Sequence, residues 1–181
     1  MKFTETNLKG GFVIELEERR DERGFFARAF CQDEFAAHGL KTEFVQCNLS
    51  HNIKRGTLRG LHFQLKPHEE VKFVRCVRGA ILDVMIDLRP DSPTKLKYFA
   101  AELTGENNKA LYIPEGFAHG YMALEDDSLV YYQVSERYTP GAERTVRYDD
   151  PDININWPDI KPLIVSAKDQ AAPFYRDIKF N

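Results

Sequence analysis

The feature that most constrains the fold is a series of short apolar segments separated by turn residues between residues 71 and 134. In residues 81–88, one face of the predicted strand carries Leu82, Val84, Ile86 and Leu88. These alternate with Ile81, Asp83, Met85 and Asp87, and Pro90 follows the run. A period of two residues is typical of a β-strand. Further segments of this kind occur at residues 71–77, 111–113, 120–124 and 129–134. Many short strands with frequent turns predict an all-β sandwich, jelly roll or barrel.

Only short helices are expected around these strands. Asp33 is placed to cap a segment that ends at His38, with Gly39 as its C-terminal stop. Ser166 and Asp169 have the spacing of a capping box. From spacing alone, we interpret Asp169 as part of a cap on a short C-terminal helix. Residues around 149–158 predict irregular structure packed over the strands. No repeat or linker interrupts the chain, so residues 1–181 are predicted to form a single domain.

Charge and apolar patterning exclude several classes of partner. The 25 basic and 28 acidic residues give a net charge of −3, which offers no general attraction for nucleic acid or an anionic membrane. No apolar run reaches the roughly 18 residues of a membrane span, and the start of the chain lacks the apolar region of a secretory signal. The three cysteines form no CxxC pair and no disulfide framework. We therefore expect a cytoplasmic protein that binds neither nucleic acid nor membrane.

Three common catalytic signatures are absent from the chain. No GxGxxG follows a strand, and there is no GxxxxGK[ST] and no GxSxG. The sequence therefore does not favour a nicotinamide-dependent enzyme, a P-loop NTPase or a serine hydrolase.

Two motifs carry the polar residues best suited to chemistry. They are Arg-Gly-Leu-His-Phe-Gln at residues 59–64 and Ile-Pro-Glu-Gly-Phe-Ala-His-Gly at residues 113–120. The second resembles the PxGxxH pattern of the cupin superfamily, whose metal-binding members carry HxH and a glutamate where the first motif falls. Here Gln64 replaces the second histidine, and the ligands that remain are His62, Glu70 and His119. A first-row metal usually needs several such ligands, so the pattern favours a metal-free pocket for acid–base chemistry.

Several residues near these motifs have both a structural and a functional interpretation. His62 taken alone is more often a core histidine, although its polar neighbours argue against an apolar face. Lys72 points to the same side of its strand as Val74, so it lies either at an exposed edge or in a functional pocket. Tyr131 and Tyr132 lie on opposite faces of one strand, and the pattern leaves open which of them enters a pocket.

The two motifs belong to an ordered set of stretches that together resemble one family. The stretches are Asp21–Phe26, Phe44–Gln46, Arg59–Gln64, Lys72, Ser92–Thr94, Ile113–Gly120, Tyr131–Tyr132, Tyr138, Glu143–Arg144, Trp157–Pro158 and Ser166–Asp169. This set, which spans nearly the whole chain, resembles the RmlC family of dTDP-4-dehydrorhamnose 3,5-epimerases. The resemblance implies a double-stranded β-helix (the cupin jelly roll) with a few short helices. It also implies a homodimer that uses no metal and no other cofactor.

The resemblance further implies a reaction in deoxysugar and surface polysaccharide biosynthesis. The substrate would be a nucleotide-linked 4-keto-6-deoxyhexose, in which the C4 ketone acidifies the protons on C3 and C5. Epimerisation then needs a base, an acid on the opposite face and a donor at the enolate oxygen. By resemblance, the catalytic residues are the base His62, its carboxylate partner Asp169, the proton donor Tyr132 and the enolate-stabilising Lys72. The expected substrate-binding residues are Arg23, Gln46, Asn48, Arg59, His119, Tyr138, Glu143 and Lys168.

Several positions depart from the family pattern, and two of them concern the nucleotide. Arg28 stands where most members carry a glutamate that helps contact the nucleotide, and Leu49 replaces a histidine of the family's QDNHS segment. A reversed charge at position 28 alters recognition of the nucleotide base most directly. The sequence therefore does not decide whether the substrate carries dTDP or another nucleotide. The alternatives to a 3,5-epimerase are an enzyme that inverts only C3 or only C5, a metal-dependent cupin such as a dioxygenase, and a non-catalytic cupin that binds sugar nucleotides.

Overall fold

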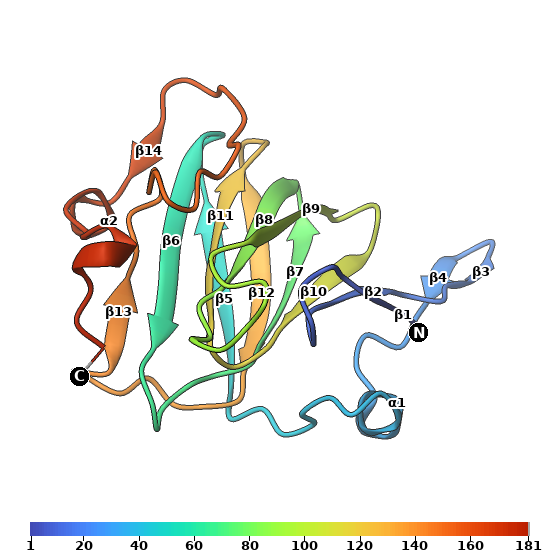
Figure 1. Cartoon of the computed structure of the whole chain (residues 1–181). Helices are drawn as coiled ribbons and strands as arrows, with labels where there is room; N and C mark the ends of the chain where they lie inside the picture. Colours follow the sequence, from blue (N-terminus) through green and yellow to red (C-terminus); the bar gives the residue numbers. More distant parts are fainter. Residues whose placement is uncertain (181) are drawn as a thin grey trace.

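The computed structural model describes residues 1–180, in which two sheets face each other and short helices lie at their edges (Figure 1). The first sheet contains, in spatial order, β1 (Lys2–Glu5), β2 (Phe12–Glu15), β10 (Lys109–Ile113), β7 (Lys72–Arg78), β12 (Ser128–Val134) and β5 (Gln46–Asn52). The second contains β13 (Glu143–Thr145), β6 (Thr57–Gln64), β11 (Phe117–Ala123), β8 (Ala80–Asp87) and β9 (Tyr98–Thr104), with β14 (Ile164–Val165) parallel to β6. The remaining elements are the hairpin of β3 (Arg19–Asp21) and β4 (Gly24–Phe26), the helices α1 (Gln32–Ala37) and α2 (Ala167–Gln170), and the 3₁₀ turn η1 (Tyr175–Asp177). The expected all-β jelly roll with a few short helices is confirmed.

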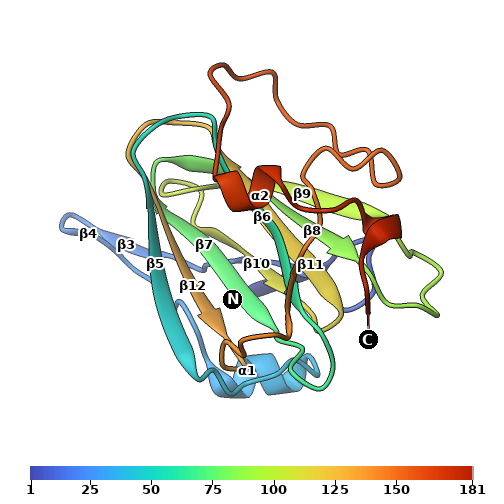
Figure 2. The ribbon, with the colours of Figure 1, turned by 90° about the vertical axis from the view of Figure 1, so that its left-hand side faces the viewer.

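The main core lies between the two sheets. Val74 on β7 and Val130 on β12 enter it from the first sheet, and Met85 on β8 enters it from the second. Because successive side chains of a strand point to opposite faces, β8 also presents Val84 to its outer face. The C-terminal segment covers that face as predicted, with Ile153 buried in the same cluster (Figure 2). Each fully buried aliphatic side chain contributes about 1.5–3 kcal/mol, so the strand pattern stabilises the sandwich on both sides of this sheet.

Helix α1 differs from the prediction at its start. It begins one residue before Asp33, and the Cys31 carbonyl accepts the first helical hydrogen bond from the Phe35 N–H at 3.0 Å. Asp33 is therefore not the cap; it lies in the first turn, where its charge suits the positive end of the helix. Gly39 adopts a φ of 69° and ends the helix as predicted. A helix this short is unstable alone, and burial of Phe35 against Phe73 stabilises it.

Strand β5 shows where apolar alternation misses a strand. Its sequence, Gln-Cys-Asn-Leu-Ser-His-Asn, reverses the usual alternation, because the polar Asn48, Ser50 and Asn52 are the more buried residues and Leu49 is exposed. It joins the first sheet because its backbone pairs with β12 over its whole length, from Gln46 opposite Val134 to Asn52 opposite Ser128. This pairing brings several polar side chains beside the interior of the sandwich.

The helices of this fold are all short. Among residues 1–180, none is long and apolar enough to cross a membrane.

Candidate active site

A cavity of about 530 Å³ opens at one end of the sandwich, between the two sheets and helix α2. The predicted residues that line it are Arg59, His62, Lys72, His119, Tyr132, Glu143, Lys168 and Asp169. A smaller cavity of about 230 Å³ shares His62, Lys72, Tyr132 and Glu143 with it and adds the predicted residues Gln46, Asn48 and Tyr138. The fold thus gathers all but one of the predicted site residues, although they are scattered along the chain.

The first feature of the cavity is a histidine–carboxylate pair. His62 Nε2 lies 2.8 Å from Asp169 Oδ1, and the Gly60 N–H approaches the other carboxylate oxygen at 3.5 Å. The Asp169 side chain is 6% exposed and the His62 side chain 38%, so the carboxylate lies beneath the ring. Burial raises the pKa of Asp169, but the hydrogen bond and charge of His62, with the Ser166 and Gly60 contacts, hold it below its usual range. The ionised Asp169 accepts a hydrogen bond from the Nε2–H of His62, which leaves Nδ1 as the basic nitrogen.

The short helix α2 brings Asp169 to His62. The Ser166 hydroxyl accepts a hydrogen bond from the Asp169 N–H at 3.1 Å, so the predicted N-cap is confirmed. The Asp169 side chain does not complete a capping box, because its carboxylate reaches His62 on β6 instead. The interpretation of Asp169 as a cap therefore holds for its backbone and not for its side chain.

The register of β7 and β12 decides which tyrosine enters the cavity. Tyr132 lies opposite Val74, and Tyr131 lies opposite Arg75. Directly opposed residues share a face of the sheet, and Val74 belongs to the core between the sheets. Tyr132 therefore points inward and lines both cavities, whereas Tyr131 is on the outer face. Burial and the charge of a nearby carboxylate, Glu70, raise the pKa of Tyr132, so its hydroxyl is protonated at neutral pH.

Lys72 lines a cavity and does not lie at an exposed edge. Its side chain is nearly buried on the inward face of β7, where it forms an ion pair with Glu70. An ammonium group has three N–H donors, so this contact leaves others for a ligand in the cavity.

A second histidine–carboxylate pair lies beside the first. His119 on β11 is opposite His62 on β6, and its Nε2 lies 2.7 Å from Asp83 Oδ1. Asp83 is completely buried, and its Oδ2 has no hydrogen-bond partner. Burial raises the pKa of Asp83, and His119 opposes that rise. Asp83 was not among the predicted site residues. It lies on the same inward face of β8 as Ile81 and Met85, and a carboxylate among core residues is the signal in the sequence that could have marked it as a site residue.

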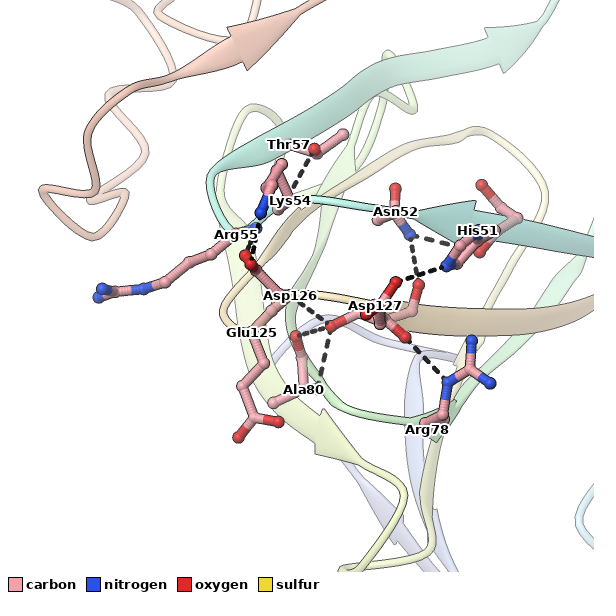
Figure 3. A network of polar contacts seen from close by, with 12 residues as sticks. His51, Asn52, Lys54, Arg55, Thr57, Arg78, Ala80, Glu125, Asp126 and Asp127 are labelled. Carbon is pink, nitrogen blue, oxygen red and sulfur yellow. Dashed lines mark hydrogen bonds and ion pairs between the residues drawn. The ribbon is translucent and has the colours of Figure 1, made fainter.

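Arg59 is held from below by a buried amide. Its Nε donates to Asn52 Oδ1 at 2.9 Å, and a terminal nitrogen donates to the His51 carbonyl at 3.2 Å. The Asn52 amide in turn donates to the Ser128 carbonyl at 3.3 Å. Figure 3 shows how His51 and Asn52 belong to a polar network that includes Asp127 and ties the turn after β5 to the turn before β12. The guanidinium is therefore oriented before any ligand arrives. Sequence reasoning missed Asn52, because nothing in its local pattern marks it.

Three predicted residues form the rim of the cavity. Lys168 Nζ lies 2.6 Å from Glu143 Oε1, and the Tyr138 hydroxyl donates to Glu143 Oε2 at 3.1 Å. The Lys168 contact is the main cause of a lowered pKa of Glu143. The ring of Tyr138 remains exposed and available for stacking.

The possible metal ligands of the first motif have separate partners. His62 contacts Asp169, His119 contacts Asp83, and Glu70 contacts Lys72. Gln64, at the position of the second cupin histidine, donates to the carbonyls of His68 and Arg137 and accepts from the Thr139 N–H. Within residues 1–180, no three His, Cys, Asp or Glu side chains are grouped to hold a metal ion.

Arg23 is the predicted residue that the fold does not bring to the cavity. It lies between β3 and β4 in a hairpin that projects from the sheets, and its side chain is 83% exposed and paired with Asp21 (Figure 1). Arg28 also lines neither cavity and pairs with Glu34 at 3.1 Å. Within one chain, therefore, neither residue lines the cavity that contains His62.

Comparison with known proteins gives consistent matches over the whole chain. The family model described as dTDP-4-dehydrorhamnose 3,5-epimerase matches residues 5–177. The dTDP-4-dehydrorhamnose 3,5-epimerase of Methanothermobacter thermautotrophicus is 44% identical over 171 residues, which cover 93% of this chain and 91% of that protein. The structure of dTDP-6-deoxy-D-glucose-3,5-epimerase RmlC from Legionella pneumophila, in complex with dTDP-4-keto-L-rhamnose, has a TM-score of 0.93 at 34% identity and covers 98% of this chain and 94% of that one. ChmJ, a 3′-monoepimerase from Streptomyces bikiniensis in complex with dTDP-quinovose, has a TM-score of 0.87 at 34% identity, with coverage of 93% and 85%.

Proposed function

The chain belongs to the family of dTDP-4-dehydrorhamnose 3,5-epimerases, and from this premise we propose how its cavity inverts C3 and C5 of a dTDP-linked 4-keto-6-deoxyhexose. The protein is an isomerase of dTDP-rhamnose biosynthesis, and its substrate is a nucleotide sugar. One observation carries the proposed mechanism: a base paired with a buried carboxylate, an ammonium group and a partly buried phenol line one cavity.

The reaction begins with removal of a proton beside the ketone. His62 Nδ1 takes the proton from C3, and the electron pair of the broken C–H bond passes into an enolate whose charge lies on the C4 oxygen. Asp169 keeps the ring oriented and balances the positive charge that the ring acquires. Lys72 donates a hydrogen bond to the enolate oxygen, and such a donor stabilises charge that exists only after deprotonation.

Inversion is completed from the opposite face of the sugar. The Tyr132 hydroxyl gives its proton to C3, the enolate electrons form the new C–H bond, and the ketone returns. Water then restores the proton on Tyr132 and accepts the one on His62. The same sequence at C5 gives the second inversion, because C5 also flanks the ketone.

The remaining predicted residues hold the nucleotide part of the substrate. Arg59 presents a planar fork of donors that suits a diphosphate, and Asn52 has already oriented it. His119 lies beside His62 and suits a contact with the sugar or the phosphates. The nucleotide extends to the rim, where Tyr138 offers a ring for stacking and Lys168 a charge. Gln46 and Asn48 supply hydrogen bonds from β5 in the smaller cavity.

Solvent isotope exchange tests this function. When the protein is incubated with dTDP-4-keto-6-deoxyglucose in deuterated water, we expect deuterium at both C3 and C5, because each carbon passes through an enolate. The label is located by NMR and mass spectrometry. Binding of the nucleotide sugar without any label would contradict the catalytic proposal and favour a cupin that only binds sugar nucleotides.

The same experiment separates a second candidate, an enzyme that inverts a single carbon. The similarity to the 3′-monoepimerase ChmJ favours keeping this candidate, because the two chains share the fold at 34% identity. Label at C3 alone would assign that activity to this chain. If deuterium enters the sugar of a substrate that carries another nucleotide but not that of the dTDP-linked substrate, the proposed nucleotide is wrong. That result would point to Arg28, where the sequence departs from the family.

We further propose that two chains form a homodimer in which each supplies Arg23 to the site of the other. The hairpin of β3 and β4 projects from the sheets and exposes Phe26 to 71% (Figure 1). An exposed aromatic residue beside an arginine remote from its own cavity fits an arm that contacts a second copy. Leu49 on β5 and Val77 on β7 add exposed apolar surface to the first sheet.

The dimer is tested by mixing two inactive variants. In a dimer of an Arg23→Ala chain and a His62→Ala chain, the site with its own His62 receives an intact Arg23 from the other chain. Refolding the two variants together is expected to restore about a quarter of wild-type activity, since half of randomly paired dimers are mixed and each has one intact site. A monomer in sedimentation, or a mixture as inactive as its parts, would contradict the exchange.

A further inference from the structure

Glu70 is a buried carboxylate of the cavity that the mechanism above does not use. It precedes β7, its side chain is only 12% exposed, and it lines the smaller cavity beside His62, Lys72 and Tyr132. Its ion-pair partner is the Lys72 ammonium, two residues along the chain. The sequence pattern raised Glu70 only as one member of an incomplete metal site. In the structure its oxygen is engaged by a lysine instead.

The Lys72 ammonium needs such a partner in order to stay charged and fixed in place. A buried charge without a partner is costly, and a lysine side chain with four rotatable bonds loses rotational freedom when it is held in one position. Lys72 contacts no carboxylate other than Glu70 among the ion pairs within residues 1–180. Since one carboxylate uses one of the three N–H donors, the pair leaves the ammonium able to donate into the cavity.

Glu70 also faces the tyrosine that donates the proton. Burial is the main cause of the raised pKa of Tyr132, the negative charge of Glu70 raises it further, and Arg59 lowers it. The titratable and charged groups that line the two cavities with Tyr132 come from several elements. They are Lys72 on β7, Arg59 and His62 on β6, His119 and Tyr121 on β11, Glu143 on β13, Tyr138 before it, and Lys168 and Asp169 on α2.

We propose that Glu70 is a positioning residue of the reaction: it holds the Lys72 ammonium where the enolate oxygen forms, and its negative charge acts on the Tyr132 hydroxyl. It touches neither the reacting carbons nor the ketone, and it works through these two side chains. The inference rests on the proposed roles of Lys72 and Tyr132.

Two variants of Glu70 test the role. Glu70→Gln keeps the shape and an oxygen acceptor for Lys72 but removes the charge, and Glu70→Ala removes both. We expect kcat to fall about 10-fold for the glutamine variant and about 100-fold for the alanine variant, with KM changed by less than about threefold, because the lost contact acts on the enolate and not on the bound nucleotide.

The pH profile provides a readout that a merely structural role would not move. Tyr132 must be protonated to act, so activity falls as the pH rises through its pKa. Removal of the Glu70 charge lowers that pKa, and the alkaline limb of kcat/KM in Glu70→Gln is therefore expected at lower pH than in the wild type. An unchanged limb together with a wild-type kcat would overturn the proposal.

Glu69→Gln is the matched control. It makes the same change of charge one residue earlier, but Glu69 lines a different cavity, near Arg89 and Gly116. Its kcat and its alkaline limb are expected to equal those of the wild type, and an equal shift in both variants would assign the effect to net charge and overturn the role of Glu70. Thermal unfolding of all variants checks that the fold is retained.

Tyr132→Phe separates failure of this inference from failure of the proposed mechanism. If its residual activity has no alkaline limb while the limb of Glu70→Gln stays in place, Glu70 does not act on Tyr132 and the mechanism stands. If Tyr132→Phe retains the limb, the phenol is not the titrating acid, and the proposed mechanism itself fails.

Discussion

Replacement of His62 with alanine is expected to abolish deuterium exchange at both C3 and C5. The variant retains Lys72 and Tyr132 but has no group at the position of Nδ1 to take a proton from the sugar. Loss of a general base lowers the rate by about 10²–10⁴-fold, and here no enolate forms without it. The measurement is the initial rate of label incorporation from deuterated water into dTDP-4-keto-6-deoxyglucose, located by NMR.

A second variant of His62 distinguishes loss of the base from loss of the folded structure. Alanine leaves the buried Asp169 carboxylate without its partner, which destabilises the site. His62→Asn keeps an N–H that can reach Asp169 but cannot act as a base, and it is expected to be equally inactive. His38→Ala, on an exposed histidine that follows α1 and lines neither cavity, serves as the control with full exchange. Wild-type exchange in His62→Asn would remove His62 as the base.

Replacement of Tyr132 with phenylalanine is expected to separate exchange from inversion. His62 still forms the enolate and can return a solvent-derived deuteron to the same face, so label is incorporated. Net inversion needs a proton on the opposite face, and its rate is expected to fall by about 10²–10⁴-fold. The ratio of label to inverted product, followed by NMR with time, measures the effect.

The neighbouring Tyr131 offers a matched control for this change. Tyr131→Phe removes the same hydroxyl from the same strand, but on the outer face of the sheet, so both exchange and inversion are expected to remain at wild-type rates. The phenylalanine ring at position 132 retains the packing against the core between the sheets. Equal losses of exchange and inversion in Tyr132→Phe would show that the phenol acts before the enolate forms, contrary to its role as the acid.

Local patterns predicted much of the fold because they report local geometry. The alternation in residues 81–88 appears as β8, with Val84 on one face and Met85 on the other. The pattern missed β5, whose more buried face is polar and whose pairing with β12 is made by the backbone. It misplaced the start of α1, because Asp33 suits the first turn of a helix as well as its cap.

The residues of the site were predictable only with the family resemblance added to the pattern. Spacing left His62 between core and base, and left Lys72 between an edge and a pocket. The structure brings both to one cavity. Asp83 and Asn52 had no predicted role, and Glu70 was considered only as a metal ligand, because the contacts of these residues with His119, Arg59 and Lys72 are visible only in three dimensions.

By itself, the sequence determined the class of fold and, within a recognised strand, which residues share a face. The side chains of a strand alternate whatever its neighbours are, so residues 71–77 alone predicted that Lys72 and Val74 share a face, and the structure showed that this face points inward. Chain separation sets the limit of such reasoning. His62 and Asp169 are 107 residues apart, and their 2.8 Å contact exists only because the C-terminal segment folds back over β6. Strand register likewise chose Tyr132 over Tyr131, because it depends on which residues pair across neighbouring strands, and no local pattern contains that information.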